Sequence, residues 1–201
     1  MNTTCLEWSV ASAAMPGESE SGDLYLACAT PNGMLVAALD GLGHGSEAAA
    51  AARAAVDTLE RYAHEPVISL LGHCHESLRP TRGVAMSLAS FDARHEMMTW
   101  IGVGNVEGFL LRADPHLPNE QLLLRSGVVG SHLPLLQAAV IPVSPGDTLL
   151  FTTDGVAHDF AQAVTINGPL QASADRVLAN GNKGTDDALV IIARYRGPRH
   201  E

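Results

Sequence analysis

Apolar residues follow two different periods along this chain, and the changes of period predict where strands and helices lie. Short apolar runs bounded by glycine, asparagine and aspartate are typical of β-strands. Such runs occupy, in chain order, residues 5–13, 23–29, 33–39, 84–91, 97–103, 106–111, 121–124, 139–143, 147–153 and 189–195. The turn formed by Pro31, Asn32 and Gly33 predicts a hairpin, because Asn-Gly adopts positive φ easily.

Three segments show helical spacing instead. The first runs from about residue 46 to 63, and Ser46 is its expected N-cap. Its apolar face is formed by residues three or four positions apart, namely Ala52, Val56, Leu59 and Ala63. The second helix is expected to begin near Pro66, and the third to cover about residues 172–179.

The order of these elements predicts an α+β fold. Helices fall in two clusters between runs of hairpin-linked strands, whereas a parallel sheet needs strands that alternate with helices. The run at 84–91 is apolar on both faces, so its sheet is expected to be covered on both sides. The runs at 106–111 and 121–124 are expected to continue as a meander. We therefore predict two antiparallel sheets packed together with helices outside, in a single domain over residues 1–201.

The composition of the chain mainly excludes certain classes of protein and of partner. The chain has 201 residues with 46% hydrophobic and 17% charged positions, and no apolar stretch is long enough to span a bilayer. A net charge of −10, without any cluster of Lys and Arg on a predicted element, argues against a nucleic-acid partner. Three widely spaced cysteines and an N-terminus unlike a signal peptide predict reduced thiols in the cytoplasm.

Aspartates stand where predicted strands begin or end. Asp40 and Asp154 close two apolar runs, while Asp23 and Asp186 precede two others, and an antiparallel sheet can bring all four to one edge. Carboxylates at such short distances repel one another unless a cation lies between them. Aspartate supplies hard oxygen ligands for Mg²⁺ or Mn²⁺, and Gly41 lets a backbone carbonyl approach the same ion. Two such ions would hold a bridging water and hydrolyse a phosphate ester by in-line attack.

The glycine-rich segment 41–45 permits other interpretations. Strand, glycine turn and helix in this order resemble a dinucleotide-binding fingerprint, although Gly41, Gly43 and Gly45 give G-x-G-x-G instead of G-x-G-x-x-G. A nucleotide-binding protein is therefore one alternative. A non-catalytic phosphoprotein-binding module and a phosphatase of small phosphate esters are two more. His44, within the segment, could donate a proton to a leaving alcohol or cap and orient the loop.

Four short motifs, taken in order, resemble those of a known family. They are Ser21-Gly22-Asp23, Asp40-Gly-Leu-Gly-His-Gly45 followed by Ser-Glu-Ala-Ala, Thr153-Asp-Gly155, and Asp186-Asp187. The set is similar to the metal-dependent PPM-type serine/threonine phosphatases, above all to the bacterial SpoIIE-like branch, and extends over residues 21–193. Residues 82–85 and 103–106 further resemble the free-standing, RsbX-like phosphatases of the stressosome.

The resemblance implies a four-layer αββα sandwich that holds two Mn²⁺ or Mg²⁺ ions. Carried onto this chain, Asp40 would bridge both ions, and the Gly41 carbonyl would bind one of them. Asp154 and Asp186 would complete one site, and Asp23 would help to form the second.

The resemblance also implies the substrates, which are phosphoserine or phosphothreonine on STAS-domain stressosome proteins.

Two features of the chain depart from the family. Leu189 stands where Thr is common, and Asp187 is either a further ligand or a structural residue. No arginine lies near Asp23 in the sequence, which leaves the metal ions alone to hold the phosphate.

Overall fold

The computed structural model describes residues 5–159, 166 and 168–198. In this part of the chain the helices are α1 (Gly45–Arg61), α2 (Val67–Leu78) and α4 (Leu170–Gly181). The strands are β1 (Leu6–Ala13), β2 (Asp23–Thr30), β3 (Gly33–Gly41), β4 (Val84–Asp92), β5 (Met97–Val103), β6 (Glu107–Leu111), β7 (Glu120–Gln121), β8 (Leu124–Arg125), β9 (Ala139–Pro142), β10 (Thr148–Thr152) and β11 (Ala188–Tyr195). None of these helices combines the length and apolar character needed to cross a membrane.

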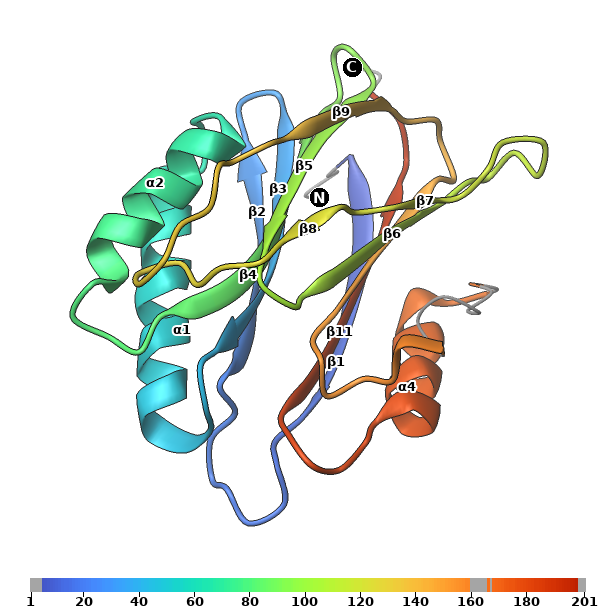
Figure 1. Ribbon diagram of the computed structural model, residues 1–201. Coiled ribbons are helices and arrows are strands. Elements are labelled where there is room, and N and C mark those ends of the chain that lie inside the picture. The colour runs from blue at the N-terminus through green and yellow to red at the C-terminus, as the bar shows by residue number, and fades with distance from the viewer. Residues whose placement is uncertain (1–4, 160–165, 167, 199–201) are drawn as a thin grey trace.

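Two sheets packed face to face form the centre of the molecule (Figure 1). One has the strand order β1-β11-β10-β6-β7, and the other has the order β2-β3-β4-β5-β8, with β9 also paired to β5. Helices α1 and α2 cover the outer face of the β2–β5 sheet, and α4 covers the other sheet. The predicted αββα sandwich is confirmed.

The predicted continuation of the meander from β5 into β6 is wrong, although β6 and β7 do pair as antiparallel neighbours. The chain leaves one sheet at Val103, and β6 pairs with β10 in the other sheet. The segment predicted as one strand at 121–124 is split, because β7 pairs with β6 while β8 returns to β5 as a parallel partner. Gly104, with φ of +99°, turns the chain at the crossing. An alternating pattern shows that a segment is extended, but it does not specify which sheet the segment joins.

Helix α1 begins one residue earlier than predicted, so the expected cap at Ser46 is wrong. His44 takes the N-cap position, but its side chain makes no capping hydrogen bond. The turn into the helix uses Gly43 and Gly45, whose φ angles are +87° and +74°. These left-handed conformations favour glycine strongly, so the sharp turn depends on both residues.

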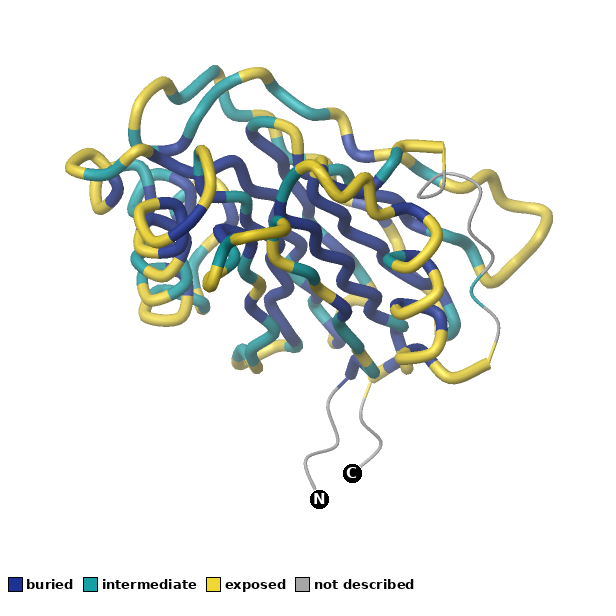
Figure 2. Tube along the Cα trace, turned by 90° about the horizontal axis from the view of Figure 1, so that it is seen from below, coloured by how far each residue is buried: buried dark blue, intermediate teal, exposed yellow. Residues whose placement is uncertain are grey.

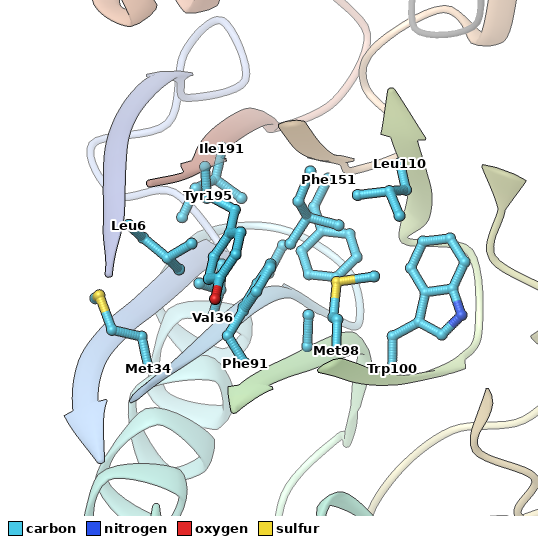
Figure 3. Close-up of a cluster of buried hydrophobic side chains, with 14 of the residues drawn as sticks. Leu6, Met34, Val36, Phe91, Met98, Trp100, Leu110, Phe151, Ile191 and Tyr195 are labelled. Carbon is cyan, nitrogen blue, oxygen red and sulfur yellow. The ribbon is translucent and has the colours of Figure 1, made fainter. Parts of the chain in front are cut away.

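Three apolar clusters hold the four layers together, and the largest lies between the sheets. Figure 3 shows side chains of the two sheets pointing toward one another, and Phe91 stacks on Tyr195 with ring centroids 6.1 Å apart. Buried residues fill the middle of the sandwich, whereas exposed residues lie on loops and on the outer sides of the helices (Figure 2). The sandwich is therefore a rigid frame, and the chain segments at its edges are available for chemistry.

Candidate metal centre

The predicted acids gather at one edge of the sandwich. Asp23, the first residue of β2, lies directly opposite Asp40 near the end of β3. Asp154 follows β10 and Asp186 precedes β11, and these two strands are antiparallel neighbours in the other sheet. The β1–β2 connection and the connection into β11 meet at the same end (Figure 1). Antiparallel pairing thus brings strand starts and strand ends together, as predicted.

Burial and mutual repulsion act on the two acids of the β2–β3 pair. The pKa of Asp23 is raised to about 8, mainly by burial and also by the charges of Asp40, Asp187 and Asp154, against the lowering effect of a hydrogen bond from Thr153. The pKa of Asp40 is likewise raised to about 7, mainly by burial and next by the charge of Asp154. Both shifts are typical of carboxylates crowded together in a place with little water.

Thr153 connects Asp23 to the other sheet. Its hydroxyl donates a hydrogen bond to Oδ2 of Asp23 at 2.6 Å and accepts one from the backbone N–H of Leu189 at 2.8 Å. No separate role was predicted for Thr153 from the sequence. A signal was present, because Thr153 is a polar residue that continues a fully buried strand, β10.

Asn105 is a second site residue that the sequence analysis missed. Its side-chain amide donates a hydrogen bond to Oδ2 of Asp154 at 2.7 Å, and its hydrogen bonding also lowers the pKa of Asp40. Asn105 lies between β5 and β6, where the chain crosses between the sheets. One amide therefore lies between carboxylates that belong to different sheets.

Asp187 uses both carboxylate oxygens on the backbone. Its Oδ1 accepts a hydrogen bond from the N–H of Met15, and its Oδ2 accepts one from the N–H of Gly22, both at 2.7 Å. The side chain is buried, and it ties the β1–β2 connection to the start of β11. Asp186 is less buried, and its Oδ1 accepts a hydrogen bond from the N–H of Asp187 at 2.8 Å. The two neighbouring acids therefore have different surroundings.

Gly41 lies where no other residue fits. A Cβ atom at this position would come within 2.3 Å of the carbonyl oxygen of Ala48 in the first turn of α1. The N–H of Gly41 also donates a hydrogen bond to the carbonyl of Gly22 at 3.1 Å. This close approach fixes the backbone of Gly41 next to Asp40, as its expected role as a carbonyl ligand requires.

His44 is exposed, and its Nδ1 lies 2.6 Å from Oε1 of Glu18. The side chain makes no capping bond with the end of the helix, and it makes a polar contact with Glu18 instead. The dinucleotide alternative for segment 41–45 is wrong. The strand before the segment, β3, pairs antiparallel with β2 and β4, whereas the fingerprint belongs to a parallel βαβ unit.

The donors at this edge suit a hard cation. Within the described residues, no Lys, Arg or His side chain forms an ion pair with the carboxylate of Asp23, Asp40, Asp154, Asp186 or Asp187. Nor does the described part of the chain contain three or more His, Cys, Asp or Glu side chains arranged to hold a metal ion by themselves. Mg²⁺ binds through one or two carboxylates and keeps several waters, so a closed cage of side chains is not required. The residues present therefore fit Mg²⁺ or Mn²⁺.

Comparisons with known proteins agree with this geometry. The chain matches the family model of stage II sporulation protein E (SpoIIE) over residues 30–196. Phosphoserine phosphatase RsbX of Bacillus subtilis (strain 168) is 33% identical over 94 residues, which are 47% of this chain and 47% of RsbX. The matched stretch thus spans about half the length of that relative.

Solved structures extend the likeness to almost the whole chain. A chain from a structure of the bacterial stressosome, described as a modular system adapted to control secondary messenger signaling, has a TM-score of 0.87 and 28% identity, and the match covers 94% of this chain and 99% of that one. The crystal structure of RsbX in complex with magnesium has a TM-score of 0.84 and 23% identity, with 94% of each chain covered.

Proposed function

The chain belongs to the SpoIIE family, and on this premise we propose that it is a metal-dependent protein serine/threonine phosphatase. One observation carries the proposal most directly. Five carboxylates meet at one edge of the sandwich, none of them in an ion pair with a cationic side chain of the described residues, and burial and repulsion raise the pKa of two of them. Such a cluster is costly unless a divalent cation compensates it. We propose that residues 1–201 form one catalytic domain around this site.

The site residues divide the work of holding two Mn²⁺ or Mg²⁺ ions. In our proposal the carboxylates of Asp23, Asp40, Asp154 and Asp186 and the backbone carbonyl of Gly41 would hold the ions. When bound, the ions polarise a phosphoryl oxygen and activate a water for in-line attack. RsbX in complex with magnesium has the same fold, which supports this choice of cofactor.

Three other residues support the ligands or the nearby backbone, and a fourth can contact the substrate. Thr153 holds the Asp23 carboxylate through its hydroxyl, and Asn105 holds Asp154 through its amide. We propose that Asp187 is structural, because its two oxygens already accept backbone hydrogen bonds. His44 is held by Glu18 on the exposed side of the loop, where it can meet a leaving alkoxide of the substrate.

We propose that the substrates are phosphoserine or phosphothreonine residues of STAS-domain stressosome proteins. The likeness to RsbX and to a chain from the stressosome supports this substrate class. Cys28 and Cys74 are free thiols, in keeping with a reducing compartment, and we propose that the protein acts in the cytoplasm.

The test is hydrolysis of p-nitrophenyl phosphate and of a phosphoserine peptide, measured with EDTA, Mg²⁺ or Mn²⁺. We expect turnover only with a divalent ion and none in Asp40→Asn. Asp57→Asn is the matched control, because Asp57 is an exposed acid on α1. Equal turnover of Asp40→Asn and the wild type would refute the metal site. Metal binding without turnover on any phosphorylated substrate would favour the non-catalytic module instead.

A further inference from the structure

An arginine lies against the glycine loop of the site. Gly41 pairs with Val84 at the sheet edge, and Arg82 lies two residues beyond that pair. Nη1 of Arg82 is so close to Gly43 that a Cβ atom there would come within 2.9 Å of it. The guanidinium therefore lies beside the backbone that follows Asp40, although the two segments are far apart in the sequence.

The backbone that carries Arg82 is fixed on both sides. The hydroxyl of Thr81 donates a hydrogen bond to the carbonyl of Leu78 at 2.7 Å and accepts one from the N–H of Gly83 at 3.0 Å. The carbonyl of Gly83 in turn accepts a hydrogen bond from the N–H of Leu42 at 3.1 Å. The turn is therefore fastened to the same loop that its arginine covers.

The guanidinium itself is only loosely engaged. Its single ion-pair partner in the described part of the chain is Glu47, in the first turn of α1, and the two side chains are 53% and 67% exposed. Exposed ion pairs contribute little to stability because water competes for both charges. A phosphate dianion offers a guanidinium two parallel hydrogen bonds, so it can displace the glutamate.

The negative charge around the site would repel a phosphorylated substrate, and an arginine can offset this repulsion. The protein has a net charge of −10, and five carboxylates lie at the edge where a phosphorylated substrate must approach. Lys183, on the other sheet's side, is engaged at 2.5 Å by the backbone carbonyl of Asp154. A cation held beside the glycine loop offsets the repulsion of the substrate.

We propose that Arg82 binds the phosphoryl group of the phosphoserine or phosphothreonine substrate, and that Glu47 positions the guanidinium and competes with the phosphate. The inference rests on the proposed phosphatase function. It replaces the expectation that the metal ions alone hold the phosphate, which considered only arginines near Asp23 in the sequence.

The experiment compares Arg82→Gln, Arg82→Lys and Glu47→Gln with the wild type. We expect Arg82→Gln to raise KM for a phosphoserine peptide, and to weaken inhibition by inorganic phosphate, by about tenfold, with a smaller change in kcat. Arg82→Lys keeps the charge but lacks the planar guanidinium, so we expect a KM between those of the wild type and Arg82→Gln. Glu47→Gln frees the guanidinium, and we expect KM and the phosphate inhibition constant to fall.

The control is Arg53→Gln. Arg53 lies on α1, as Glu47 does, and its substitution breaks a comparable exposed ion pair with Glu20 of the β1–β2 connection. We expect no change in KM for this variant. A purely structural Arg82–Glu47 pair predicts that both substitutions change KM in the same direction and lower the melting temperature together. That outcome overturns the inference, and so does an unchanged KM in Arg82→Gln.

A binding measurement separates failure of the inference from failure of the proposed function. Calorimetric titration with inorganic phosphate in the presence of Mg²⁺ needs no turnover. Phosphate binding that is about tenfold weaker in Arg82→Gln than in the wild type supports the inference even if no hydrolysis is found. Equal binding by the two proteins, or binding by neither, overturns it. Normal wild-type hydrolysis with equal phosphate binding leaves the phosphatase function standing.

Discussion

The hydroxyl of Thr153 donates a 2.6 Å hydrogen bond to the carboxylate of Asp23, across the interface between the two sheets. The two residues are 130 positions apart, and each lies at the end of a strand. The orientation of one proposed metal ligand therefore depends on how the sheets are packed, and any change in that packing is transmitted to the site.

Thr153→Val should destabilise the protein and weaken metal binding. Valine has nearly the same shape but leaves Asp23 without its donor and the N–H of Leu189 without its acceptor. We expect a loss of about 1–3 kcal/mol in the free energy of unfolding, measured with urea. Thr152→Val is the control, because the buried hydroxyl of Thr152 has no hydrogen-bond partner among the residues that the structure describes, so its loss should be neutral or stabilising. Equal effects of the two variants would contradict this account.

Asp187→Asn should separate stability from metal binding. The amide can accept only one of the two backbone hydrogen bonds that the carboxylate accepts from Met15 and Gly22. We expect the free energy of unfolding to fall by about 1–3 kcal/mol, while the affinity for Mg²⁺ changes far less than in Asp40→Asn. Calorimetric metal titration of both variants measures the difference. A loss of Mg²⁺ binding as large as that of Asp40→Asn would make Asp187 a ligand.

Gly41→Ala should disrupt the site through the backbone. The added Cβ would lie 2.3 Å from the carbonyl oxygen of Ala48, so the start of α1 must move. We expect a loss of about 1–3 kcal/mol in the free energy of unfolding together with weaker metal binding. Gly72→Ala is the matched control, because a Cβ at this position in α2 has nothing within 4 Å. That variant should gain about 0.5–1 kcal/mol from the higher helix propensity of alanine.

The metal-free protein should become less stable as the pH rises. Burial raises the pKa of Asp23 to about 8 and that of Asp40 to about 7, above their ordinary value of 3.8. Between these values the folded state holds protons that the unfolded state releases, so the free energy of unfolding falls as the pH rises from about 4 to about 8. Melting temperatures in EDTA across this range measure the slope.

Two additions sharpen the pH experiment. Asp23→Asn cannot titrate at that position, so its melting temperature should depend less on pH than that of the wild type. Mg²⁺ binds the ionised carboxylates of the folded state, so it should raise the melting temperature most at the alkaline end. A wild-type slope of the opposite sign would show that the folded protein keeps these acids ionised without metal.

Local features of the fold could be predicted from the sequence. Apolar period and turn residues located the hairpin of β2 and β3 and helix α2 close to their observed positions. The acids of the site were also found, because a strand end followed by Asp-Gly is a local pattern. Pairing partners are not local, which is why the assignment of β6, β7 and β8 to sheets failed.

The residues that support the site were missed for the same reason. Thr153 and Asn105 act on carboxylates of distant segments, and Arg82 covers a loop that begins about forty positions earlier. Their roles come from sheet packing and from the crossing between the sheets. No sequence spacing connects these three residues to their partners, whereas each acid of the site lies next to a strand end that the local sequence pattern reveals.

The pairing of β1 with β11, in which Leu6 lies opposite Tyr195, has a consequence for biosynthesis. Contacts between such distant segments form late, because the chain between them must first be ordered. A nascent chain can build the β2–β3 hairpin and helix α1 early, but β1 remains without its neighbour until β11 has been made. Asp40 and Asp186 therefore meet only when the chain has left the ribosome as far as β11. Translation that stops before β11 yields a product in which Asp40 and Asp186 are not brought together.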